Sequence, residues 1–256
     1  MSMTLRLKER LRAGAWHLLV SVLVALAVTA LVFGLWFPGA YRYMAGGTGL
    51  LLLIMGVDVV LGPLLTFAVF DRRKGVRHLQ RDIATIAAIQ LAALAYGFYT
   101  VQLARPVALV FEHDRFRIVS AADVVNAELP EALPEFRHLP LDGPRLMAVR
   151  KTHQGAERNE ALAAAVLDGV DTSQRPRFWT PYGKAERDSA FQVARPMGLL
   201  EAQYSGAGSL IQQAVLGMGL TVANARFLPV RARNDAVAVL APDGNIAGFL
   251  PYDGFF

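Results

Sequence analysis

The chain has 256 residues, of which 54% are hydrophobic and only 18% are charged, against about 25% charged residues in a typical soluble domain. This composition excludes a disordered chain, and the lack of cysteine excludes a disulfide framework and a thiolate metal site. Residues 1–104 carry ten Lys and Arg against four Asp and Glu, whereas residues 105–256 carry sixteen against seventeen. The excess positive charge therefore flanks the apolar part of the chain, which is typical of a membrane protein and not of a nucleic-acid-binding surface.

Three apolar runs in the first 104 residues are each long enough to span a bilayer, which takes about 20 residues. They cover residues 16–37, 49–70 and 83–103. The first run is longer than the core of a signal peptide, and no clear small-residue cleavage motif follows it, so we expect an uncleaved anchor. The sequence therefore predicts a transmembrane domain over residues 1–104.

The short loops predict the orientation of these spans. The segment before the first span and the loop between the second and third spans hold nine of the ten basic residues. The loop between the first and second spans holds only Arg42. The positive-inside rule then places the N-terminus in the cytoplasm and residues 105–256 on the periplasmic side of a bacterial inner membrane.

Asp58 lies near the middle of the second span, where a carboxylate costs about 2.5–3.5 kcal/mol on insertion scales. Counted from the cytoplasmic ends of the spans, Thr29 and Tyr96 lie at nearly the same depth, so one interpretation is a hydrogen-bonded layer of Thr29, Asp58 and Tyr96. The alternative is contact with a helix of a partner protein, for which Asp58 and Pro63 are the candidates. Ion transport is not favoured, because three spans with one acid make a poor pathway.

Residues 105–256 are predicted to form one α+β domain, because this stretch is long enough for its own core and the composition changes at Ala104-Arg105-Pro106. Strands are expected at 107–112, 116–119, 146–151, 237–240 and 246–250, and helices at 121–127, 156–167, 184–194 and 210–216. The predicted fold class is thus three N-terminal transmembrane helices followed by a periplasmic α+β domain.

No constellation of residues predicts catalysis, a cofactor or a metal ion. His113, His138 and His153 lack the spacing of metal ligands. The segment 206–209 lacks the strand context and the trailing glycine of a nucleophile elbow. We therefore expect no enzyme, no cofactor and no metal site.

The segment RPRFWTPYGK (175–184) contains Phe178, Trp179 and Tyr182 together with two prolines and several basic residues. Aromatic and arginine side chains dominate the energetic centres of protein interfaces, so these three aromatics are the candidate periplasmic interface. The alternative is a loop whose aromatics fill the core of the domain itself, because most tryptophans are buried.

Several motifs give the chain a resemblance to a known family. They are HLLVS (17–21), WFPG (36–39), GG (46–47), GVDVVLGPLLT (56–66), RDIATIAAIQLAALAYG (81–97) and ARPVALVFEHDRF (104–116). With these motifs the sequence resembles the type IV pilin accessory proteins of the TfpX/TfpZ kind over roughly its first 120 residues. The resemblance implies an inner-membrane protein that helps a cognate pilin assemble, and it brings no cofactor and no catalytic residue.

The predicted function is therefore that of a membrane chaperone or modulator of type IV pilus (fimbrium) biogenesis. Its expected partners are the major type IV pilin, the pilus assembly machinery and the lipid bilayer, with no nucleic acid. Two alternatives stay open: an extracytoplasmic sensor, whose cytoplasmic parts would be too small for a signalling domain, and a membrane-anchored envelope enzyme, which no motif predicts.

Overall fold

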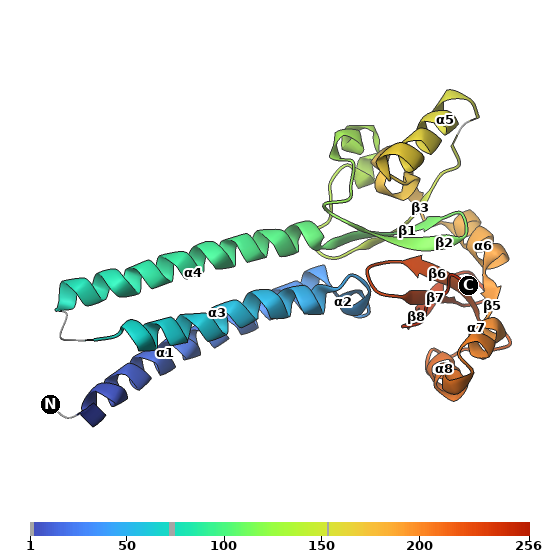
Figure 1. Ribbon diagram of the computed structural model, residues 1–256. Helices are drawn as coiled ribbons and strands as arrows, with labels where there is room; N and C mark the ends of the chain where they lie inside the picture. Colours follow the sequence, from blue (N-terminus) through green and yellow to red (C-terminus); the bar gives the residue numbers. More distant parts are fainter. Residues whose placement is uncertain (1–2, 72–74, 153) are drawn as a thin grey trace. The chain divides into compact units, whose positions relative to one another are not determined.

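The structure is a computed structural model that describes residues 3–71, 75–152 and 154–256 and separates into two compact units (Figure 1). The helical unit consists of Met1–Leu35 and Gly47–Leu103, and the sheet unit consists of Trp36–Gly46 and Ala104–Phe256. His153 and three basic residues of the second loop, Arg72, Arg73 and Lys74, lie outside the described residues.

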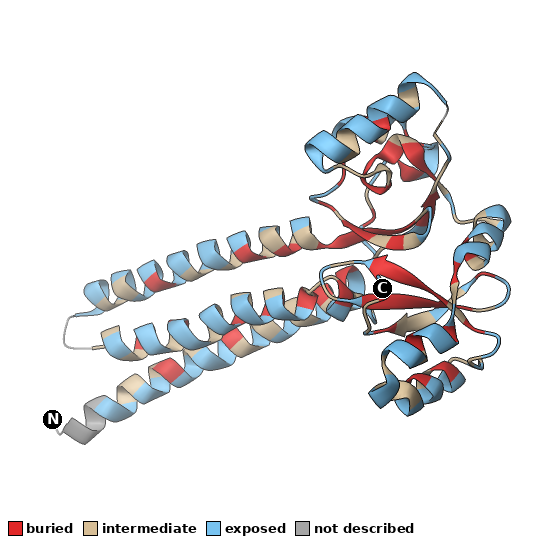
Figure 2. Ribbon diagram, turned by 45° about the vertical axis from the view of Figure 1, so that its right-hand side comes forward, coloured by how far each residue is buried: buried red, intermediate tan, exposed pale blue. Residues whose placement is uncertain are grey.

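Three long helices form the helical unit: α1 (Met3–Leu31), which continues into the π-helical turn η1 (Val32–Trp36), α3 (Gly47–Val69) and α4 (Val76–Ala104). All three are long and apolar enough to cross a membrane, which confirms the predicted spans. Their exposed faces are rich in leucine and mostly pale blue in Figure 2, as expected for helices whose solvent is lipid. All three helices begin earlier than the predicted spans, α1 at Met3, α3 at Gly47 and α4 at Val76.

Polar contacts join α1 to α3 near one end of the bundle. Arg10 donates from Nε to the carbonyl of Phe70 at 2.9 Å, and its guanidinium lies 3.9 Å from the carboxylate of Asp71. One to two turns further along, His17 Nδ1 lies 2.5 Å from Thr66 Oγ1. These contacts fix how α1 and α3 are paired along their length.

The sheet unit is built on eight strands in the order β4-β3-β1-β2-β6-β7-β8, with β5 paired to β6. The strands are β1 (Pro106–Glu112), β2 (Arg115–Ser120), β3 (Arg145–Val149), β4 (Trp179–Pro181), β5 (Arg195–Pro196), β6 (Arg226–Arg231), β7 (Ala236–Leu240) and β8 (Ile246–Leu250). The pairs β1–β3 and β2–β6 are parallel and the other pairs are antiparallel.

Both faces of the sheet are covered at β1 and β7, which are buried along nearly their whole length. In β1 the side chains of Leu109 and Phe111 enter one core cluster and those of Ala108 and Val110 enter another, as the two-residue period of a strand requires. A third cluster packs Phe227 and its neighbours on β7 against two helices. Figure 2 shows the central strands in red.

The helices of the sheet unit are short. They are α2 (Tyr41–Met44), α5 (Ala156–Ala163), α6 (Lys184–Val193), α7 (Met197–Gln203) and α8 (Gly208–Gly217). Single turns are η3 (Asn126–Glu131), η4 (Pro134–Phe136), η5 (Ala164–Asp168), η6 (Thr172–Gln174), η7 (Pro176–Phe178) and η8 (Ser205–Ala207). The helices predicted at 156–167, 184–194 and 210–216 are confirmed. The helix predicted at 121–127 is wrong: this stretch forms turns, and the backbone N–H of Val125 donates to the carbonyl of Gln174 at 2.9 Å and not to a helical partner.

The loop between the first two spans belongs to the sheet unit. Met44 is fully buried in the same core cluster as Phe116, and its carbonyl accepts the backbone N–H groups of Arg233 and Asn234 at 3.0 and 3.1 Å. That residue 104 separates two domains stays a prediction. The segment Trp36–Gly46, which lies well before residue 104, packs into the sheet unit.

Candidate functional site

The polar centre of the helical unit is a hydrogen bond between α3 and α4. Gln90 donates from Nε2 to Asp58 Oδ1 at 3.1 Å, and the same nitrogen lies 3.4 Å from the carbonyl oxygen of Asp58. Both side chains are partly buried. A polar pair of this kind lowers the cost of placing both side chains in an apolar medium.

The structure does not bring together the predicted layer of Thr29, Asp58 and Tyr96. Among the described residues, no hydrogen bond joins Asp58 to Thr29 or Tyr96, and the Tyr96 side chain is 73% exposed. The depth of Thr29 and Tyr96 in the membrane was counted from the predicted starts of their spans. In the structure α1 begins thirteen residues and α4 seven residues before those starts. The position on α4 that meets Asp58 therefore moves from Tyr96 to Gln90.

A groove of about 310 Å³ runs between α3 and α4 around this pair. Asp58 and Gln90 contribute polar groups, and most of the remaining lining is aliphatic, including Val57 and Leu61. Tyr96 lies on the groove as well, on the α4 side. The groove is therefore an apolar surface with a few polar groups near the middle of the helices.

Two glycines leave room for side chains of the facing helix between α3 and α4. A Cβ atom on Gly62 would overlap the side-chain amide of Gln90, and one on Gly97 would lie 2.5 Å from Cγ2 of Ile54. Small residues at such contacts are typical of helix packing in membranes. Gly62 thus leaves the space in which the Gln90 amide reaches Asp58.

A second, smaller cavity of about 200 Å³ lies on the α1 side of Asp58. It is lined by His17 and Ser21 from α1 together with Asp58 and Gln90. Pro63 does not line the α3–α4 groove; its backbone carbonyl lies on the α1 side, 3.4 Å from the place of a Cβ on Gly14. The role of Pro63 in partner contact stays a prediction.

Substitutions of Asp58 are expected to separate the hydrogen bond from the charge. Asp58→Asn keeps an acceptor for Gln90, so the stability of the helical unit should change little. Asp58→Leu leaves the Gln90 amide without this acceptor and should cost about 0.6–2 kcal/mol. The measurement is the thermal midpoint of the full chain in detergent, with Gln90→Leu as the matched variant; equal midpoints for wild type, Asp58→Leu and Gln90→Leu would contradict the expectation.

In the sheet unit, the candidate interface residues Phe178 and Trp179 are core residues. Phe178 is 0% and Trp179 2% exposed, which corrects the expectation that they present an interface. The Trp179 indole donates from Nε1 to the carbonyl of Ser173 at 2.8 Å and packs edge-on against Phe136.

Tyr182 also points inward. Its ring packs edge-on against Phe111 and Phe116, and its hydroxyl donates to the carbonyl of Gly244 at 2.9 Å. Burial raises the pKa of the Tyr182 phenol well above its ordinary value. All three candidate aromatics therefore contribute to packing within the sheet unit.

The basic residues around these aromatics form a buried ion cluster. Arg175 donates from Nε and Nη2 to Glu128 Oε1 at 2.8 and 2.6 Å, and Glu160 accepts from both Arg175 and Arg177. Three guanidinium groups, those of Arg150, Arg175 and Arg177, lie 5.0–5.2 Å from the centre of the Phe178 ring. Burial raises the pKa of Glu128, and the Arg177 guanidinium opposes that effect.

No arrangement for metal binding is found in the part of the chain that the structure describes, where no three His, Asp or Glu side chains gather around a common point. His113 lies in the β1–β2 turn with φ of 58°, a backbone role, and His138 is an exposed surface residue.

Three side chains of the helical unit were not assigned a role from the sequence: His17, Thr66 and Gln90. A signal was present for each, because they are polar residues within apolar runs, and such residues face other helices. His17 begins the HLLVS motif and Thr66 ends the GVDVVLGPLLT motif, and the structure shows these two residues in contact. Which residue a polar side chain contacts, however, depends on how the helices pair, and the sequence of one helix does not specify that pairing.

Comparison with known proteins gives one consistent result. The family model described as "Fimbrial assembly protein FimB" matches residues 5–46. Over 246 residues, covering 93% of both chains, the sequence is 38% identical to "Fimbrial assembly protein, serogroup E1" and 36% identical to "Fimbrial assembly protein, serogroup I", both of Dichelobacter nodosus. A further relative, "Fimbrial assembly protein, serogroups C1 and C2" of the same organism, is 44% identical over 116 residues, which are 45% of this chain and 88% of that one.

No solved structure gives a significant match to the chain. The full-length relatives, however, cover the helical unit and the sheet unit together at more than a third identity. The resemblance seen in the motifs of the first 120 residues is thereby confirmed, and the chain belongs to the FimB family of fimbrial assembly proteins.

Proposed function

We propose that this protein is an inner-membrane accessory protein that assists or modulates the assembly of a cognate type IV pilin. Family membership supports a role in fimbrial biogenesis. The observation that carries the finer proposal is the α3–α4 groove, because it offers an apolar helix a long contact surface with Asp58 and Gln90 at its middle. A pilin that awaits assembly has one such helix in the membrane.

The chemistry of the groove suits a transmembrane helix better than a small molecule. Helix association in lipid depends on close packing and on a few polar contacts, since lipid is as apolar as the helices. Within the described residues, Gln90 is the one hydrogen-bond partner of the Asp58 carboxylate, through Oδ1. Asp58 Oδ2 is thereby left as an acceptor for a donor on the bound helix. The sheet unit would contact the pilin head.

Photo-crosslinking tests this proposal directly. A photoreactive phenylalanine analogue at Leu61, which lines the groove, should give an adduct with pilin in cells. The control is Leu23 on α1, which is exposed to a similar extent, 58% against 51%, and does not line the groove. Adducts from both positions, or from Leu23 alone, would exclude the groove as the binding site.

A deletion strain gives the functional readout. Loss of the protein should lower surface piliation and twitching, and the pilin level measured in the same cells separates an effect on stability from one on assembly. Unchanged pilin level, piliation and twitching together would refute the assembly role. Piliation of the variants Asp58→Asn and Asp58→Leu, compared at equal membrane abundance, then tests whether Asp58 contacts pilin. Normal piliation in both variants would exclude that contact.

The proposed topology has the N-terminus in the cytoplasm and the sheet unit in the periplasm, on the basis of the basic loop residues. Alkaline phosphatase, which is active only outside the cytoplasm, should be active when fused after Phe256 or at Tyr43 and silent when fused at Gly75. An active fusion at Gly75 together with a silent one after Phe256 would invert the topology.

A further inference from the structure

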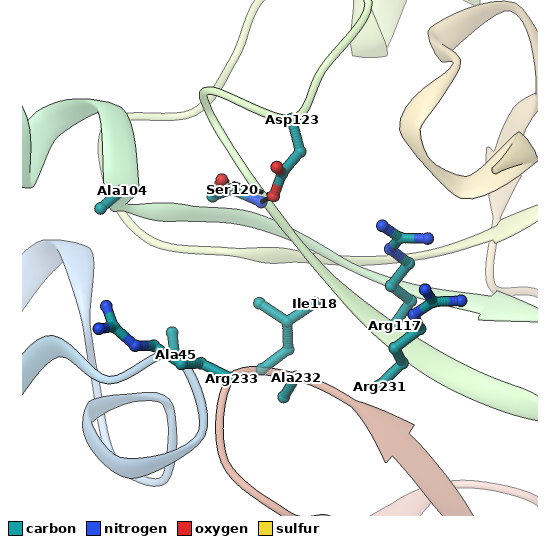
Figure 3. Close-up of a pocket in the computed structure, with 9 residues that line it drawn as sticks. All are labelled: Ala45, Ala104, Arg117, Ile118, Ser120, Asp123, Arg231, Ala232 and Arg233. Atoms are coloured by element: carbon teal, nitrogen blue, oxygen red, sulfur yellow. Dashed lines mark hydrogen bonds between the residues drawn. The ribbon is translucent and has the colours of Figure 1, made fainter. Parts of the chain in front are cut away.

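A pocket of about 310 Å³ in the sheet unit carries three arginines, Arg117, Arg231 and Arg233 (Figure 3). It has no part in the α3–α4 groove or in the ion cluster around Glu128. Figure 3 shows Arg117 and Arg231 together on one side of the pocket and Arg233 on another.

Arg117 and Arg231 are direct register partners on the neighbouring parallel strands β2 and β6. Side chains in such positions point to the same face of the sheet, and like charges placed there repel each other. One carboxylate lies between them: Asp171 Oδ2 accepts from Arg117 Nη1 and, at 3.2 Å, from Arg231 Nη1. One carboxylate therefore contacts both guanidinium groups, so the three side chains together carry a net positive charge.

Arg233 adds a third positive charge from the turn after β6. Its stem passes directly over Gly46, where a Cβ atom would lie 2.5 Å from the Arg233 Cδ and where φ is +70°. No ion pair of Arg233 occurs among the described residues, and its side chain is exposed. Gly46 thus leaves the space that holds the Arg233 stem against the loop before α3.

One acidic side chain, Asp123, also lines the pocket. Its carboxylate accepts hydrogen bonds from the backbone N–H of Ser120 at 3.1 Å and from the Ser120 hydroxyl at 2.6 Å. Two donors already hold Asp123, as Figure 3 shows, so the three guanidinium groups remain in excess of the acids that contact them.

Residues that line this pocket adjoin the predicted transmembrane helices in the sequence. Two of its lining residues are Ala104, the last residue of α4, and Ala45, two residues before Gly47 begins α3. The ends of two spans therefore lie within a few residues of the pocket, whichever side of the membrane the sheet unit occupies. The anions that occur at high density at this level are lipid phosphates.

We propose that Arg117, Arg231 and Arg233 form a binding site for the phosphate group of an anionic phospholipid at the surface of the membrane. Arginine suits this role because its planar guanidinium donates two parallel hydrogen bonds to phosphate oxygens. The bound lipid balances the charge of the Arg117–Arg231 pair and holds the sheet unit at the bilayer surface. This site is independent of the pilin contact proposed above.

The test is lipid binding to the purified full chain in detergent, measured by native mass spectrometry with phosphatidylglycerol, with phosphatidylcholine of the same acyl chains, and with inorganic phosphate. Wild type should bind phosphatidylglycerol more tightly than phosphatidylcholine. Arg231→Gln and Arg233→Gln should each weaken phosphatidylglycerol binding about fivefold, and the double variant about 25-fold. Both side chains are exposed, so the thermal midpoint should not change.

Arg158→Gln is the matched control, because Arg158 is an exposed arginine of α5 that does not line the pocket. This variant should bind phosphatidylglycerol as tightly as wild type does. It shows whether removing any exposed arginine, away from the pocket, weakens lipid binding. Equal phosphatidylglycerol affinity in wild type and the double variant would overturn the proposal, as would equal affinity for the two lipids. Displacement of phosphatidylglycerol by an equal concentration of inorganic phosphate would assign the site to a soluble anion instead.

Discussion

Arg175→Met is expected to destabilise the sheet unit by about 3–5 kcal/mol, because it removes the closest partner of a buried carboxylate and leaves it only Arg177, whose Nε lies 3.4 Å away. Glu128 is 8% exposed and receives both of its short hydrogen bonds from Arg175. Methionine retains an apolar side chain that can fill the space of the arginine stem, so the loss reflects the missing guanidinium and not a large cavity. For a unit of this size the thermal midpoint of the full chain should fall by about 10 °C.

Glu160→Gln is the control for this experiment. Glu160 contacts Arg175 and Arg177, but its side chain is 57% exposed, and exposed ion pairs contribute only about 0–1 kcal/mol. The double variant Glu128→Gln with Arg175→Met removes both charges and should recover part of the loss, because no buried charge then lacks a partner. A midpoint for Arg175→Met within 2 °C of wild type would show that Glu128 is not held by this pair.

The sequence predicted which segments span the membrane but not how the helices pair. Apolar length identifies a span, and it ignores charged residues that extend the same helix into water. Both α1 and α4 continue through such residues, which moved the estimated depth of their polar side chains. Asp58 was therefore recognised as an interhelical residue, while its partner, Gln90, came from the contact between α3 and α4.

Strand β6 shows a different limit. Its sequence, RFLPVR, carries a proline in the middle, and proline argues against a central strand because it cannot donate a ladder hydrogen bond. The structure accommodates Pro229 because β6 pairs with β2 only at Val230 and Arg231, beyond the proline. The signal for β6 thus lies in its neighbours β2 and β7, which are distant in sequence.

The segment 175–184 failed as a predicted interface for a related reason. Aromatics next to arginines are typical of interface centres, but the same residue types form a buried ion cluster when carboxylates are available. Here the carboxylates come from Glu128 and Glu160, 47 and 15 residues before Arg175. Local sequence could not decide between the two alternatives, because the deciding residues lie elsewhere in the chain.

The loop between the first two spans leads to the second large expected effect. Met44→Ala should destabilise the sheet unit by about 2–5 kcal/mol, because Met44 is 1% exposed within the core cluster that contains Leu109, Phe116 and Leu228. A fragment that starts at Arg105 lacks this side chain altogether, so it should unfold at a lower temperature than the sheet unit of the full chain.

Tyr43→Ala is the matched control for Met44→Ala, since the neighbouring side chain is 47% exposed and Tyr43 bonds to Asn234 through its backbone carbonyl. Its effect should stay within about 0.5 kcal/mol. The measurement is the thermal midpoint of both variants in detergent, followed by limited proteolysis to locate the unit that opens. Equal midpoints for Met44→Ala and Tyr43→Ala would mean that the burial of Met44 does not stabilise the sheet unit. A selective loss for Met44→Ala would mean instead that a connection between two spans is part of the core, because its burial stabilises strands more than sixty residues away.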